Sequence, residues 1–187
     1  VHPHGLVDDR VPGTIEAMAA DHVRAVRALR PRGPYLLGGH CNGAFVAFEM
    51  ARQLTADGEE VPVVVLIEAE APRPGAGSPG DGGGQRFVKV GKDGAPEVLA
   101  ARDRVSDIDL RYRHVLDGYS GAPWGGHVVV IQAQERNRGP GAGWGRLAPD
   151  CESFLVPGGH VTLITRHLDE LAAVVRAALA RAQEVAA

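Results

Sequence analysis

The chain has 187 residues, of which 44% are hydrophobic and 23% are charged, and its formal net charge is −3. This length suits one domain with a sizeable core, and the balanced charge excludes the basic surface that nucleic-acid binding requires. No apolar run approaches the roughly 20 residues of a membrane span, and no signal peptide is visible. With only two cysteines, we expect no disulfide framework and a reduced, cytoplasmic setting.

The first part of the chain alternates between helix and strand. Apolar residues recur at helical spacing over residues 14–30, where Thr14 is placed to cap the helix. A short apolar run at 35–39 predicts a buried strand, and a second helix is expected over 42–56. The β-branched run at 61–68 is apolar on both faces, so it predicts a central strand.

The alternation continues after a segment at 71–84 that is rich in glycine and proline and predicts a mobile loop. The remaining elements are expected as a helix, two strands and a last helix, over 107–118, 127–133, 152–158 and 167–183. Helices alternating with apolar strands predict an α/β fold with a mostly parallel sheet and helices on both faces.

Residues 39–43 read Gly-His-Cys-Asn-Gly and fit the pattern of a nucleophile held on a sharp turn between a strand and a helix. The two glycines remove Cβ atoms that we expect to clash in such a turn. The N-terminus of the following helix favours a thiolate at Cys41, and the backbone N–H of Asn42 can donate to an oxyanion. We interpret Cys41 as a nucleophile, the alternative being a small buried thiol in a tight corner.

The nucleophile needs a base and an acid that orients it. His160 follows the last strand and two glycines, which places it at the same edge of a doubly wound sheet as Cys41. Glu68 ends a strand at that edge and is the favoured acid, while Glu135 and Glu70 remain alternatives. Each could instead be an ordinary loop histidine or a solvated glutamate. No metal site is predicted.

Cys151 begins the strand expected at 152–158, so it should lie at the opposite, N-terminal edge of the sheet from Cys41. A disulfide would require the two Cα atoms to lie within about 7 Å of each other. We therefore expect Cys151 to be a structural or surface thiol.

The stretch 14–54, which contains "GPYLLGGHCNGAFVAFEMARQL", resembles the thioesterase domains that end nonribosomal peptide and polyketide synthetases. The stretches "YSGAPWGGHVVVIQAQE", "GWGRLAP" and "LVPGGHVTLITRHLDEL" continue the resemblance. It implies a single domain of the α/β-hydrolase fold over 1–187, with the family's variable lid at about 71–106.

The resemblance also implies a function. Cys41, His160 and Glu68 would form a catalytic triad that takes an acyl or peptidyl chain from the phosphopantetheine thioester of a carrier protein. Release would occur by hydrolysis or cyclisation, with no bound cofactor and with the carrier protein as partner. The alternatives are a non-catalytic or degraded module of the hydrolase fold, or a cysteine hydrolase of a small ester or lactone.

The chain departs from the family pattern in three ways. Cys41 stands where serine is usual, and Glu68 stands where aspartate is usual. The opening strands of the family, and the loop that supplies a second oxyanion donor, have no counterpart in the sequence. We therefore expect a sheet that is incomplete at its N-terminal side.

Overall fold

Four parallel strands form the centre of the protein, in a computed structural model that describes residues 11–73, 111–112 and 114–185. The strands are β1 (Leu36–His40), β2 (Val63–Ile67), β3 (Val128–Ala133) and β4 (Cys151–Val156). Each pairs in parallel with the next, so their order in the sheet equals their order in the chain. All four carboxyl ends therefore meet at one edge of the sheet.

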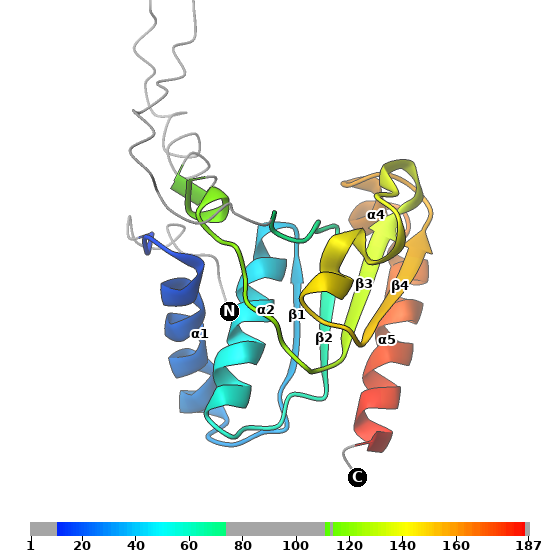
Figure 1. The fold of residues 1–187 in the computed structure, drawn as a ribbon. Helices are drawn as coiled ribbons and strands as arrows, with labels where there is room; N and C mark the ends of the chain where they lie inside the picture. Colours follow the sequence, from blue (N-terminus) through cyan, green and yellow to red (C-terminus); the bar gives the residue numbers. More distant parts are fainter. Residues whose placement is uncertain (1–10, 74–110, 113, 186–187) are drawn as a thin grey trace, which may run out of the picture.

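Helices α1 (Ile15–Leu29) and α2 (Asn42–Ala56) pack together over one face of the sheet (Figure 1). The Thr14 hydroxyl caps α1 by accepting a hydrogen bond of 3.1 Å from the Ala17 N–H, as the sequence predicts. Alternate residues of β2 face the α1–α2 layer, where Val64 and Leu66 join its core. This burial fixes the position of α2, which the candidate nucleophile Cys41 directly precedes.

The opposite face of the sheet is covered by α5 (Leu168–Val185) (Figure 1). Val63 and Val65 of β2 point to this side and share a buried cluster with Leu171 of α5. A parallel sheet buried on both faces agrees with the apolar strands that the sequence predicts. None of the helices within the described ranges is long and apolar enough to cross a membrane.

A buried carboxylate ties the region after the undescribed residues 74–110 to helix α2. Glu49 is only 3% exposed, and it accepts hydrogen bonds from Arg52 at 2.6 Å and from the Tyr119 hydroxyl at 3.0 Å. Burial, reinforced by the Glu49 charge, raises the pKa of Tyr119. On the other side of the same gap, the Arg146 guanidinium donates to the carbonyl of Pro72.

The predicted elements are present, with corrections at their ends. The helix at 42–56 has the predicted bounds, and residues 111–112 and 114–117 are helical within the predicted range 107–118. The last strand stops at Val156 because Gly158 turns the chain with φ of 94°. The loop predicted at 71–84 lies outside the described residues from position 74 onward.

Three short elements were not predicted: η1 (Gln134–Arg136), η2 (Pro140–Arg146) and α4 (Thr162–Thr165). The backbone of η2 includes Gly141 and Gly143 at positive φ, and Ala142 also has φ of 45°. Elements this short and irregular carry no hydrophobic periodicity, so the sequence pattern could not reveal them.

Candidate active site

The turn that carries Cys41 is sharp and has an unusual backbone. Cys41 has φ of 53°, a conformation that non-glycine residues rarely adopt, and its N–H donates to the carbonyl of Ile67 at 2.8 Å. A Cβ on Gly39 would lie 2.1 Å from the carbonyl oxygen of Gly43, so position 39 must be glycine. This conformation lifts the thiol above the carboxyl edge of the sheet.

The second glycine of the motif has a different role from the one predicted. A Cβ on Gly43 would meet no described atom within 4 Å, so its side chain would not clash. The close approach is between the backbone of Gly43 and the Cα of Gly39. The expectation that both glycines are needed to remove a Cβ is therefore wrong for Gly43.

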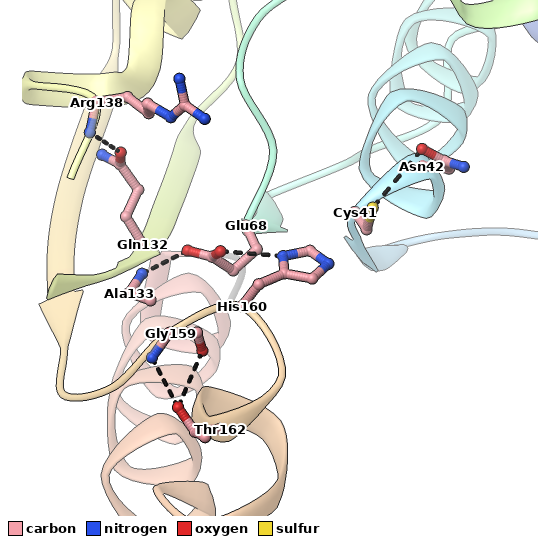
Figure 2. Close-up of polar contacts among 9 residues, drawn as sticks. All are labelled: Cys41, Asn42, Glu68, Gln132, Ala133, Arg138, Gly159, His160 and Thr162. Atoms are coloured by element: carbon pink, nitrogen blue, oxygen red, sulfur yellow. Dashed lines mark hydrogen bonds and ion pairs between the residues drawn. The ribbon is translucent and has the colours of Figure 1, made fainter. Parts of the chain in front are cut away.

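The thiol of Cys41 lies at the N-terminus of α2, partly exposed (Figure 2). Its Sγ is 3.7 Å from the side-chain oxygen of Asn42. Among the described residues the backbone N–H of Asn42 donates to no acceptor, as the first turn of a helix allows. Cys41 is not hydrogen-bonded to His160. In Figure 2, Glu68 lies on one side of the His160 ring and Cys41 lies beyond the other side.

The imidazole of His160 is bound to Glu68 (Figure 2). One carboxylate oxygen of Glu68 lies 3.1 Å from Nδ1 of His160, and the other accepts a hydrogen bond of 2.5 Å from the Ala133 N–H. The Glu68 side chain is 4% exposed, whereas that of His160 is 30% exposed. A buried carboxylate with both oxygens engaged holds the imidazole by Nδ1 and leaves Nε2 for other partners.

The loop that carries His160 is closed by short contacts. The Gly159 N–H donates to the Thr162 hydroxyl at 2.7 Å (Figure 2). The Leu163 N–H donates to the Gly159 carbonyl at 2.9 Å. Gly158 has positive φ, and a Cβ there would lie 2.6 Å from the Thr162 hydroxyl. The two glycines before His160 therefore allow α4 to fold back directly beneath the histidine.

The two alternative acids have other partners. The Glu135 N–H donates to the carbonyl of Gly158 at 3.1 Å, and the exposed Glu135 carboxylate lies against Gly159, so it contacts the backbone of this loop. Glu70 is more than half exposed and lies 3.7 Å from Arg138. Glu70 and Arg138 line a cavity of about 50 Å³ that also borders Glu68.

Cys151 begins β4 opposite Val128, at the N-terminal edge of the sheet. Both cysteines are free, and burial raises the pKa of the Cys151 thiol, with the charges of Asp150 and Glu152 adding to the effect. The position predicted for Cys151 is therefore confirmed. In the described part of the chain, no group of three or more His, Cys, Asp or Glu side chains is arranged to hold a metal ion.

Comparison with known protein families gives one match that includes two residues of the candidate site. The model of the thioesterase domain family matches residues 2–106, which is more than half of the chain and includes Cys41 and Glu68. The chain belongs to the thioesterase domain family. The thioesterase family named from the sequence is thereby confirmed.

Solved structures support the same assignment for this thioesterase domain. The NocB thioesterase domain, in a covalent complex with a fluorophosphonate nocardicin G analogue, is 31% identical to it. The superposition covers 92% of this chain and 77% of that one, with a TM-score of 0.72. A second structure of the NocB thioesterase domain, from the nocardicin cluster, is 29% identical with a TM-score of 0.71, and these neighbours confirm the predicted α/β-hydrolase-like fold.

Curated relatives of the thioesterase domain are much larger proteins. A non-reducing polyketide synthase of Arthrinium sp. is 49% identical over 59 residues, and a dimodular nonribosomal peptide synthase of Bacillus subtilis is 41% identical over 61 residues. These matches cover 32% and 33% of the chain but only 3% of either relative.

One residue of the thioesterase domain was not recognised as part of the site from the sequence. The ring of His40 stacks on that of His160, with ring centroids 5.0 Å apart. The sequence places His40 next to Cys41, but strand alternation points neighbouring side chains in different directions. Only the path of the loop after β4 brings the two rings together.

Proposed function

We propose that this thioesterase domain accepts an acyl or peptidyl chain on Cys41 from the phosphopantetheine thioester of a carrier protein. It would then release the chain by hydrolysis or cyclisation, in the cytoplasm and without a bound cofactor. The observation that supports this best is the buried Glu68 carboxylate at 3.1 Å from His160 Nδ1, at the sheet edge that also carries Cys41. This is how a triad acid orients its histidine.

In the acylation step, His160 would accept the proton of Cys41 through Nε2, and the thiolate would attack the thioester carbonyl. The tetrahedral oxyanion would be stabilised by the free N–H of Asn42 and by the N-terminus of α2. Collapse expels the phosphopantetheine thiolate, which takes its proton from His160. Cys41 and His160 would have to approach when substrate binds, since catalytic hydrogen bonds are often loose in unliganded enzymes.

In the release step, His160 would take a proton from water, or from a hydroxyl or amine of the bound chain, as that group attacks the Cys41 thioester. Expulsion of the Cys41 thiolate regenerates the enzyme and gives a free acid or a cyclic product. A thioester is more activated than the ester that a serine would form. Cysteine at this position therefore favours transfer to amines and other weak nucleophiles.

The relatives support this proposal. The NocB domain forms a covalent complex with a fluorophosphonate analogue of nocardicin G, which agrees with covalent catalysis at this fold. The curated relatives are polyketide and nonribosomal peptide synthases, and we infer from them a carrier protein as partner.

The proposal is tested by incubating the purified chain with a short acyl-pantetheine thioester and measuring the intact mass. We expect one acyl group per chain, located on Cys41 by peptide mapping, followed by slow loss of the acyl group to water. Cys41→Ala should remain unmodified, whereas the matched variant Cys151→Ala should be acylated at the wild-type rate because Cys151 lies at the other edge of the sheet.

Labelling that persists in Cys41→Ala and disappears in Cys151→Ala would overturn the proposal. Failure of the folded wild-type chain to release pantetheine or to gain mass would instead favour a non-catalytic module of the hydrolase fold.

A further inference from the structure

The ring of His40 stacks on the face of the His160 ring, whereas Glu68 contacts that ring at its Nδ1 atom. The two ring planes are inclined by 30° and their centroids are 5.0 Å apart, within the range of stacked aromatic pairs. His40 is the last residue of β1 and therefore has a backbone fixed by the sheet, whereas His160 is carried by a loop.

His40 is partly buried. Its Nε2 atom is inaccessible and has no hydrogen-bond partner among the described residues. Burial lowers the pKa of His40 and the neighbouring His160 lowers it further, while the charge of Glu68 and a hydrogen bond with the backbone of His160 oppose these effects. The lowered pKa favours the neutral form of the ring, which can lie beside His160 without adding a positive charge.

We propose that His40 is a positioning residue whose flat ring sets the tilt of the His160 imidazole. This inference rests on the proposed function, because it assigns His40 a role only if His160 serves Cys41.

The hydrogen bond to Glu68 alone does not determine the direction of Nε2. It holds His160 at a single atom, Nδ1, so the ring can still tilt out of its plane about that contact. A flat neighbour at 5.0 Å removes the space for tilting on one side. With Glu68 and His40 together, the imidazole is constrained in two directions.

A neutral ring at position 40 has a second consequence during catalysis. When His160 accepts the proton of Cys41, it becomes an imidazolium, which is attracted to an aromatic face. A protonated His40 would repel it instead. The lowered pKa of His40 therefore supports a role that depends on His40 staying neutral while His160 changes charge.

The test compares His40→Phe with His40→Leu in a Cys151→Ala background, so that Cys41 is the only thiol. Phenylalanine keeps a flat ring and leucine fills space without one. The readouts are the rate of acylation by a short acyl-pantetheine thioester and the pH profile of Cys41 alkylation by iodoacetamide. His160→Ala gives the rates expected when the imidazole is absent.

We expect His40→Phe to acylate at close to the parent rate with an unchanged midpoint of the alkylation profile. His40→Leu should be slower by about 10-fold or more, since small errors of placement are costly in catalysis. Its alkylation midpoint should move toward that of His160→Ala. If His40→Leu does not fold, as judged by circular dichroism, His40→Ala is used in the same comparison.

Equal rates and midpoints for the leucine and phenylalanine variants, with His160→Ala still impaired, would overturn the role of His40 and leave the proposed function standing. A His160→Ala variant as reactive as the parent would overturn the proposed function itself.

Thermal unfolding gives a separate check that His40 is held neutral. A lowered pKa means that the unfolded chain binds more protons than the folded one, so His40 lowers stability as pH falls below about 6.5. The melting temperature of His40→Phe relative to that of the parent should therefore rise as the pH is lowered from 7.5 to 5. An advantage that is independent of pH would contradict a neutral buried ring.

Discussion

At Glu68, a single carboxylate joins two strands and one loop. One oxygen accepts from the backbone of Ala133 at the end of β3, and the other contacts His160 Nδ1. The residue has φ of 54°, so the chain bends sharply as it leaves β2. This bend, and not the regular alternation of a strand, determines where the side chain points.

We predict that the substitution Glu68→Gln slows acylation. The amide oxygen would keep the bond from Ala133, so the amide NH₂ would face His160 and force Nδ1 to act as the acceptor. Nε2 would then carry the proton and could not accept one from Cys41. We expect acylation from an acyl-pantetheine thioester to slow by about 10²-fold or more, with the melting temperature nearly unchanged.

Glu135→Gln is the matched control, because its exposed carboxylate lies against the backbone of the His160 loop and not against the ring. It should acylate at the wild-type rate. Slow acylation in Glu135→Gln with normal acylation in Glu68→Gln would assign the orienting role to Glu135.

The choice among the three glutamates shows what the sequence could and could not provide. The apolar strand before Glu68 was enough to place it at the correct edge. Glu70 and Glu135 lie at the same edge and could not be excluded, because their directions depend on turns that have no periodic pattern. The structure gives Glu70 the partner Arg138 and brings Glu68 to the imidazole, while the catalytic roles remain proposals.

The turn from β1 to α2 contains two glycines, and a side chain would be tolerated at only one of these positions. A Cβ on Gly39 would meet backbone atoms of Gly43 at 2.1 Å, which cannot move away without unwinding the first turn of α2. A Cβ on Gly43 would enter open space within the described residues.

We therefore predict opposite effects for two chemically identical substitutions. Gly39→Ala should lower the free energy of unfolding by about 3 kcal/mol or more, in the range of severe steric substitutions. Gly43→Ala should leave it unchanged or raise it by about 0.5–1 kcal/mol, since alanine is the better helix former. Chemical denaturation measures both. A Gly39→Ala protein as stable as the wild type would mean that the turn is less tight than described.

The sequence predicted long periodic elements better than their ends. Helix α2 was placed with its observed bounds because a glycine turn begins it and an Asp-Gly pair follows it. The range predicted for strand β4 extended too far at its C-terminal end, because it included Pro157 and Gly158 with the apolar run before them. The turns of η2 could not be foreseen because three consecutive residues take positive φ.

Strand β1 lies at an edge of the sheet in the described part of the chain, because it pairs only with β2. The side chain of Leu36, its first residue, is 37% exposed. The edge of a sheet presents unpaired N–H and C=O groups that another chain can pair with.

We predict that the purified chain self-associates at high concentration and that Leu36→Lys reduces this association. A lysine on an edge strand opposes pairing through its charge and its solvation. Sedimentation velocity over a range of concentrations measures the effect. Leu29→Lys is the matched control, because Leu29 is 90% exposed at the end of α1 and belongs to no strand. An equal effect of both substitutions would argue against pairing through β1.

The connection between β2 and β3 is about 60 residues long, yet the chain is fastened on both sides of residues 74–110. Arg146 binds the Pro72 carbonyl before that range, and Tyr119 binds the buried Glu49 after it. Doubling the length of a flexible connection costs only about 0.6 kcal/mol. The positions of the strands and of the Glu68–His160 pair therefore depend little on the sequence of residues 74–110. Residues 74–110 could therefore be exchanged between family members while the strands and the Glu68–His160 pair stay in place.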